Sequence, residues 1–152
     1  MRRRCLCSLL LLLSGLFYIP GYTYEARAFS PETYINEIKI DGNTIPLSPP
    51  AFISSGRTMV PVMFMAVNQS IGAQVAWDGL LRKVSVNCRE HRIELTIGQK
   101  TALVDGQRCA MDAAPLIWQN RTYIPLSFVA AHLGGRVQWN SESRAISINF
   151  NY

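Results

Sequence analysis

The sequence predicts an α+β, β-rich fold made of duplicated antiparallel hairpin-helix-hairpin units, with one helix per repeat packed on antiparallel sheet. Three observations predict it: an internal repeat, short alternating apolar segments bounded by turn residues, and two stretches with helical spacing. With 152 residues, the chain has room for one domain.

The internal repeat is the most informative feature. Residues 41–66 align with residues 105–130 at a shift of 64, and residues 71–87 align with residues 133–149 at a shift of 62. Eight identities in the first block and six in the second give 14 of 43 positions, too many for chance. Duplicated small units bury their apolar faces against each other. The repeats 38–97 and 100–150 are therefore predicted to share one core.

The N-terminus has the pattern of a secretory signal peptide. Arginines at positions 2–4 precede an apolar run over residues 5–19, and Ala26-Arg27-Ala28 fits a small-x-small cleavage site. We expect residues 1–28 to be removed by cleavage between Ala28 and Phe29. An uncleaved membrane anchor is the alternative, but the run of 15 residues is shorter than the roughly 20 that span a bilayer. The predicted location is secreted: extracellular or in the cell envelope.

The charge of the mature chain gives no reason to expect a nucleic-acid partner. The whole chain has 15 Lys and Arg against 10 Asp and Glu, a net charge of +5. The leader carries four arginines and one glutamate, which is +3 of that total and leaves +2. These charges are scattered without a basic run, so no nucleic-acid binding is predicted.

Alternating segments and turns predict the elements of each repeat. After a linker over residues 29–37, Asp41-Gly42 and Asp105-Gly106 are typical of tight hairpin turns. A helix is expected from Pro61 to about residue 71 and another from Pro125 to about residue 133, since proline suits a helix's first turn. The remaining predicted strands cover residues 38–40, 45–47, 52–53, 58–60, 74–77, 83–88 and 91–97, then 102–104, 109–111, 116–118, 122–124, 137–139 and 145–150.

Two cysteines remain after the leader is removed. Cys88 and Cys109 form an even pair in an oxidising compartment, which predicts a disulfide. Closing that loop would stabilise the fold by roughly 3 kcal/mol. Two buried thiols that never meet are the alternative.

The sequence of both repeats resembles the copper amine oxidase N-terminal-like domain, also called the stalk domain. The resemblance rests on Gly56-Arg57-Thr58-Met59-Val60-Pro61 with Val75-Ala76-Trp77-Asp78, and on Asn120-Arg121-Thr122-Tyr123-Ile124-Pro125 with Val137-Gln138-Trp139-Asn140. It covers roughly residues 38–150. It implies an antiparallel sheet wrapped on a helix, found in exported bacterial proteins and without the oxidase's chemistry. The arginine usual after Pro-Leu is replaced by Met63 and Ser127.

The residues give little support for catalysis, so the chain is predicted not to be an enzyme. A copper amine oxidase needs three histidine ligands, whereas the mature chain has only His91 and His132. No Gly-x-Ser-x-Gly motif and no glycine-rich phosphate loop occurs. No metal or cofactor is expected.

Tryptophans and two equivalent arginines are the candidate contacts. Alternation points Trp77 and Trp139 inward, whereas Trp118 lies beside a turn and is the better candidate for an exposed partner contact. Arg57 and Arg121 could clamp a carboxylate or phosphate of a partner. Alternatively, they could tie their turns to Asp41 or Asp105, or to carbonyls at a helix end.

These observations predict a non-catalytic exported module of the cell envelope or surface, binding cell-wall polymer or another exported protein. The alternative is a structural self-association unit that forms a homodimer through a sheet edge or helix face. Membrane contact is expected only if the signal segment is retained.

Overall fold

The computed structural model describes residues 16–19, 22–25, 29–69 and 71–150. The chain divides into two compact units, Met1–Ser30 and Pro31–Tyr152. In the first unit, β1 (Leu16–Ile19) and β2 (Tyr22–Glu25) form an antiparallel hairpin within the predicted signal peptide. The predicted cleavage position at Ala28 lies outside the described residues. None of the helices in the described part of the chain has the length and apolar character needed to cross a membrane.

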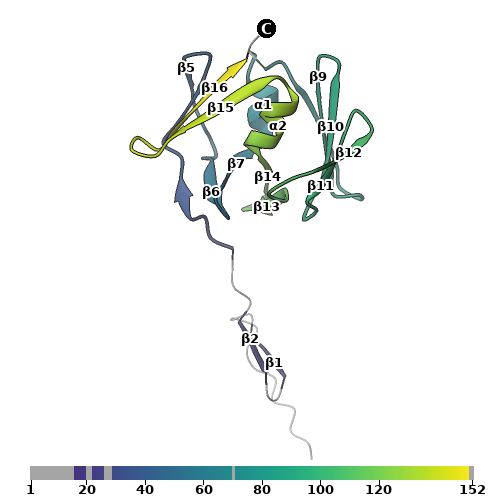
Figure 1. The fold of residues 1–152 in the computed structure, drawn as a ribbon. Helices are drawn as coiled ribbons and strands as arrows, with labels where there is room; N and C mark the ends of the chain where they lie inside the picture. The colour runs from purple at the N-terminus through teal and green to yellow at the C-terminus, as the bar shows by residue number, and fades with distance from the viewer. Residues whose placement is uncertain (1–15, 20–21, 26–28, 70, 151–152) are drawn as a thin grey trace, which may run out of the picture. The chain divides into compact units, whose positions relative to one another are not determined.

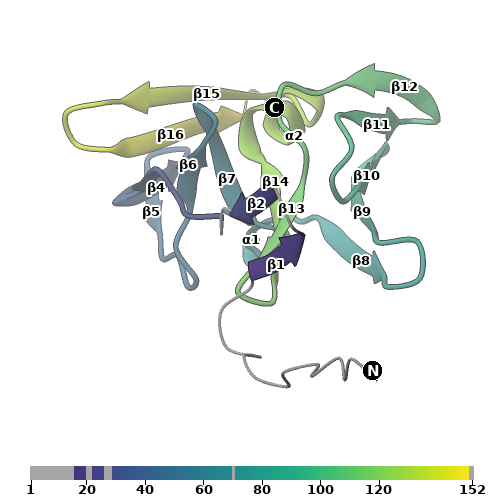
Figure 2. The same cartoon turned by 90° about the horizontal axis from the view of Figure 1, so that it is seen from below.

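The described part of the second unit is β-rich, with three sheets and two short helices, which confirms the predicted β-rich class. Its strand orders are β12-β11-β10-β9-β8, β13-β14-β7-β6-β3 and β15-β16-β4-β5. Helices α1 (Met63–Val67) and α2 (Leu126–His132) lie between the first and the third of these sheets (Figures 1 and 2). The strands are β3 (Thr33–Tyr34), β4 (Glu37–Ile40), β5 (Asn43–Ile45), β6 (Phe52–Ser54), β7 (Arg57–Pro61), β8 (Gln74–Asp78), β9 (Lys83–Cys88), β10 (His91–Thr96), β11 (Thr101–Val104), β12 (Gln107–Ala110), β13 (Leu116–Trp118), β14 (Arg121–Pro125), β15 (Gly135–Asn140) and β16 (Ala145–Phe150).

Two of the hairpins turn at the predicted Asp-Gly pairs. Asp41 and Gly42 have φ of 48° and 83° between β4 and β5, and Asp105 and Gly106 have φ of 50° and 81° between β11 and β12. Positive φ at both central residues matches the right-handed twist of the strands, and glycine adopts it without a steric penalty. These two turn predictions are confirmed.

Both helices begin later than predicted, and α1 ends at Val67 rather than near residue 71. Pro61 and Pro125 end strands β7 and β14 instead of opening the helices, and Pro125 has an extended backbone with φ −70° and ψ 111°. Proline's fixed φ suits an extended residue as well as a helical one, so proline alone did not decide the boundary. The ladder continues past Pro61, because the N–H of Val62 donates to the carbonyl of Thr122 at 2.9 Å.

The central strands β7 and β14 join the two halves of the chain. Val60 lies opposite Ile124, its counterpart at the shift of 64, and both are fully buried. One apolar cluster extends from this pair and contains residues from both predicted repeats. Its fully buried members include Ile38, Ile40, Val84, Val86, Ile93, Leu95, Leu126, Val129 and Ile146.

One strand pair is parallel, which the sequence did not predict. β16, near the C-terminus, pairs with β4 with Ile146 opposite Ile38 and Ile148 opposite Ile40. All four isoleucines are buried, so the pairing adds an apolar face to the common core. In the sequence, β4 is the first strand of this sheet and β16 is the last. Their pairing therefore joins the beginning of the second unit to its end.

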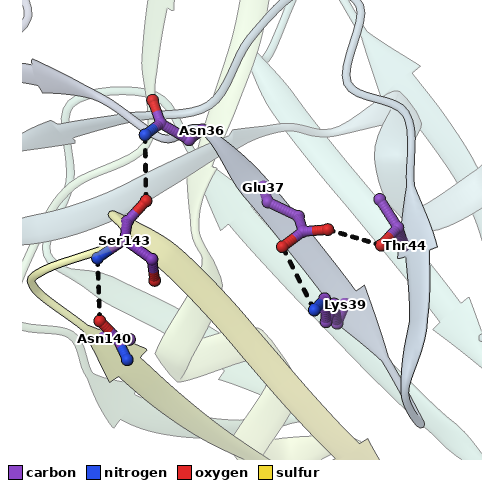
Figure 3. Close-up of polar contacts among 6 residues, drawn as sticks. All are labelled: Asn36, Glu37, Lys39, Thr44, Asn140 and Ser143. Atoms are coloured by element: carbon purple, nitrogen blue, oxygen red, sulfur yellow. Dashed lines mark hydrogen bonds and ion pairs between the residues drawn. The ribbon is translucent and has the colours of Figure 1, made fainter.

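Polar contacts hold the start of this parallel pair (Figure 3). The side-chain amide of Asn36 donates to the carbonyl of Ser143 at 3.0 Å, and the N–H of Ser143 donates to Oδ1 of Asn140 at 3.0 Å. On the other side of β4, Glu37 accepts a hydrogen bond from Thr44 on β5 and pairs with Lys39, as Figure 3 also shows. These contacts fix where β4 enters between its neighbours.

We predict that Ile124→Ala lowers the free energy of unfolding by about 2–5 kcal/mol, since it leaves a cavity at the junction of the halves. The matched control is Ile117→Ala on the neighbouring strand β13, where the side chain is exposed. That control should cost less than about 1 kcal/mol. Urea unfolding of both variants measures the difference, and equal losses would contradict a shared core at this pair.

Candidate binding site

Trp77 and Trp139 are exposed, contrary to the prediction that both pack in the core. Their exposed fractions are 47% and 42%. Both side chains do lie on the core face of their sheets, as predicted, because Trp77 lies opposite buried Val84 and Trp139 lies opposite buried Ile146. β8 and β15 are the end strands of their sheets, so both indoles extend beyond the core that their neighbours fill. Alternation predicts the face of a strand, whereas strand order decides whether that face is covered.

Trp118 is half-buried in an aromatic cluster, contrary to the prediction of an exposed partner contact. Its ring centroid lies 5.1 Å from that of Phe52, 5.9 Å from Tyr123 and 6.2 Å from Tyr34. Phe52 and Tyr123 are fully buried and belong to a second apolar cluster, smaller than the one that contains Val60 and Ile124. The turn beside Trp118 did not prevent packing, because aromatic residues from three other strands surround it.

Arg57 forms an ion pair with Asp112 rather than with either predicted aspartate. Nε and Nη2 of Arg57 lie 3.1 Å and 3.0 Å from the same oxygen, Oδ2 of Asp112. The predicted partners are engaged elsewhere: Asp41 accepts a backbone N–H, and Asp105 accepts hydrogen bonds from β10. Arg121 is exposed and has no ion-pair partner in the described part of the chain. The two equivalent arginines therefore have different surroundings.

An open hollow of about 350 Å³ lies beside this ion pair. Its walls come from the β6–β7 hairpin, the start of α2, β15 and the segment after β12. The lining residues are Ile53, Gly56, Arg57, Thr58, Asp112, Ser127, Val137 and Trp139. A second hollow of about 250 Å³ also includes Arg57, Asp112 and Ser127 in its walls. Of the three predicted partner contacts, Arg57 lines this hollow, whereas Arg121 and Trp118 do not. Trp139, which was predicted to pack in the core, lines it instead.

The groups around the hollow suit a ligand with hydroxyl groups and a flat apolar face. Trp139 supplies an exposed indole, while Ser127 and Thr58 supply hydroxyls that both donate and accept. Oδ1 of Asp112 has no protein partner among the described residues, so it can accept another hydrogen bond. Because Arg57 and Asp112 neutralise each other, the hollow has no net charge to attract an anion. Catalysis is not indicated by this set of groups.

Sequence reasoning missed Asp112 and Ser127 as members of the site. The repeat alignment contains the signal, because Asp112 corresponds to Ser48 and Ser127 corresponds to Met63. Both positions are more polar in the second repeat than in the first.

The predicted disulfide is not formed, since Cys88 and Cys109 are both free. Cys88 lies on β9 and Cys109 on β12, with β10 and β11 between them. Three strand spacings amount to about 14 Å, beyond the roughly 7 Å between Cα atoms that a disulfide permits. Burial raises the pKa of the Cys88 thiol, which lies 3.1 Å from the carbonyl of Ile71. Cys88 is thus a buried thiol, as the alternative to a disulfide predicted.

The two histidines lie in unrelated surroundings. Nδ1 of His91 is 2.9 Å from Oδ2 of Asp105, and Nδ1 of His132 is 2.8 Å from the carbonyl of Phe128 on the same helix. The N–H of Arg92 and the contact with His91 lower the pKa of Asp105. Within the described ranges, no group of three or more potential metal-ligating side chains occurs.

A separate hollow of about 220 Å³ lies on the sheet formed by β9 to β12. Two of its charged residues, Lys83 and Glu94, pair with each other at 3.0 Å, and Glu94 also pairs with Arg92 at 2.8 Å. The hydrogen bond from Lys83, aided by the charges of Lys83 and Arg92, lowers the pKa of Glu94. This cluster ties three charged residues of β9 and β10 together and is a weaker candidate for binding.

We predict that Glu94→Gln destabilises the protein at neutral pH and that the difference from the wild type shrinks in acid. A carboxyl with a lowered pKa in the folded state stabilises it above the ordinary carboxyl pKa, and this contribution is lost as pH falls through the folded-state value. Unfolding free energies measured from neutral pH to about pH 3 test this. Glu142→Gln in the exposed β15–β16 turn is the control, and an identical pH dependence for both variants would contradict the assignment.

We predict that Arg57→Ala lowers the free energy of unfolding by at most about 1 kcal/mol, because the Arg57–Asp112 pair is exposed to solvent. Arg121→Ala is the matched control at the equivalent position. Thermal and urea unfolding measure both. A loss well above that limit for Arg57→Ala would indicate that the arginine serves the scaffold and leaves little reason to regard it as a binding residue.

The chain matches a known protein family. A family model described as the copper amine oxidase N-terminal domain matches residues 39–148. The matched range includes Arg57, Asp112, Ser127 and Trp139, and so contains the main polar and aromatic groups of the hollow. None of the curated proteins that were compared with the chain matches it.

Proposed function

Because the chain belongs to the copper amine oxidase N-terminal domain family, which is a non-catalytic accessory domain, we propose that it is an exported accessory module that binds cell-wall polymer. The binding site is the hollow beside the Arg57–Asp112 ion pair. The proposal includes the absence of catalytic activity and export by the predicted signal peptide over residues 1–28.

The exposed indole of Trp139 within a polar hollow is the observation that carries this proposal. A sugar ring presents an apolar face that stacks on an indole and hydroxyl groups at its rim that need both donors and acceptors. Ser127, Thr58 and the free oxygen of Asp112 supply such groups around Trp139. The volume of about 350 Å³ falls at the lower end of the range for small-ligand sites, which suits one sugar unit of a longer chain.

The charge of the site favours a neutral glycan over an anionic polymer. Both nitrogens of Arg57 that approach Asp112 bind one carboxylate oxygen, so the guanidinium is already compensated. An anionic group would have to compete with Asp112, whereas a hydroxyl can bind beside the pair without displacing it. Binding to another exported protein is the competing outcome of the test.

We also infer that the second unit arose by duplication and that its two repeats are related by a twofold axis at the Val60–Ile124 pair. The register supports this. At the shift of 64, Met59 corresponds to Tyr123 and Pro61 corresponds to Pro125. In the ladder Met59 lies opposite Pro125 and Pro61 lies opposite Tyr123, as a twofold axis requires. In this arrangement the equivalent of Trp139 and Arg57 is Trp77 and Arg121. Among the residues that the structure describes, Arg57 has an aspartate beside it and Arg121 has none.

We predict that the purified protein sediments with insoluble cell-wall glycan from which proteins and anionic polymers have been removed. Trp139→Ala should reduce the bound fraction about tenfold, and Arg57→Ala should also reduce it, because each removes a wall of the hollow. Arg121→Ala is the matched control and should bind like the wild type. If the wild type stays in the supernatant, the wall-polymer proposal fails. If it sediments and Trp139→Ala binds equally well, the site lies elsewhere.

A further inference from the structure

The outer edge of β8 is unprotected. β8 is the last strand of its sheet, so it has a neighbouring strand on one side only among the described residues. Proteins commonly protect such an edge with lysine, proline or a bulge, and the five residues Gln74–Asp78 include neither lysine nor proline. The single charged residue, Asp78, directs Oδ1 to the N–H groups of Leu80 and Leu81, both at 2.9 Å. Its carboxylate therefore shapes the adjacent turn.

Large apolar side chains gather beside this edge. The exposed fractions are 97% for Leu80, 61% for Leu81 and 47% for Trp77. The indole lies against the turn, because a Cβ added at Gly79 would be 3.5 Å from Nε1 of Trp77. We call Trp77, Leu80 and Leu81 the β8 patch.

We propose that the β8 patch binds a second copy of this chain, with the two β8 strands antiparallel and Ala76 opposite its counterpart. In this register Val75 lies opposite Trp77 of the second copy, and Gln74 lies opposite Asp78. The Gln74 amide can donate to the Asp78 carboxylate, and no two like charges face each other. Antiparallel pairing of identical strands is twofold symmetric, so each copy offers the same surface and the assembly closes as a dimer.

The pairing also continues a face that is already buried within each copy. Val75 and Trp77 lie opposite Val86 and Val84 on β9, both of which are fully buried. A second β8 strand would place its own Val75 and Trp77 beside this row and cover the overhanging indole. Leu80 and Leu81 would then lie alongside the segment that precedes β8 in the second copy. The apolar layer would thus extend without a break from one copy to the other.

The equivalent edge strand β15 is less suited to the same contact. Its exposed Trp139 lies among Arg57, Asp112 and Ser127 in the candidate binding hollow. The turn after β15, residues 141–144, is exposed and contains Ser, Glu, Ser and Arg in place of the two leucines. Covering this edge with a second copy would desolvate those polar groups. The two repeats therefore present one apolar edge for self-association and one polar edge for a ligand.

Sedimentation equilibrium of the purified full chain, from micromolar to near-millimolar concentration, tests the proposal. We expect a concentration-dependent monomer–dimer equilibrium. Trp77→Lys should raise the dimer dissociation constant about tenfold or more, because it places a charge in the centre of the pairing. Trp139→Lys makes the same change on the equivalent strand and should leave the dissociation constant unchanged.

Circular dichroism and thermal unfolding establish that each variant is folded. If Trp77→Lys does not fold, the double variant Leu80→Ser, Leu81→Ser takes its place, since both side chains lie on an exposed turn. A wild type that stays monomeric at every concentration overturns the proposal. So does a dimer that both the Trp77→Lys and the leucine variants leave intact, or one that dissociates with Trp139→Lys instead.

Discussion

The fold of the second unit depends on the burial of the antiparallel pair β7 and β14. Val60 and Ile124 face each other there without solvent exposure, and each strand comes from a different half of the chain. Helices α1 and α2 follow directly from these strands and pack between the outer sheets (Figure 1). A half of about 60 residues buries a smaller share of its apolar surface than the whole unit does and would be only marginally stable by itself. The central pair is therefore where each half obtains its missing core.

Strand order then decides which side chains remain at the surface. β8 and β15 are end strands, so the indoles of Trp77 and Trp139 face the core side but extend beyond it. At β15 the surrounding groups are Arg57, Asp112 and Ser127, whereas at β8 they are Leu80 and Leu81. Two positions that correspond in the sequence alignment thus lie on surfaces of opposite polarity.

The candidate site is assembled from segments far apart in the sequence. Arg57 lies at the start of β7, Asp112 follows β12, Ser127 is in α2 and Trp139 is on β15. The ion pair between Arg57 and Asp112 connects the β6–β7 hairpin to the segment that links β12 and β13. As an exposed pair it contributes little to stability. The pair is neutral as a whole, and it places hydrogen-bond donors and an acceptor beside the exposed indole of Trp139.

Local chemistry determined much of this protein from sequence alone: the Asp41-Gly42 and Asp105-Gly106 turns, the presence of a helix soon after Pro61 and Pro125, and the β-rich class all follow from residues close together in the sequence. The helix boundaries did not follow from it. The family followed from the repeated Arg-Thr-x-x-Pro and Val-x-Trp patterns. Only the tertiary structure decided that Cys88 and Cys109 are separated by two strands, that Trp118 is packed, and that Arg57 meets Asp112. Each of these depends on which strands are neighbours, and strand order is set by burial of the whole core, which no local pattern records.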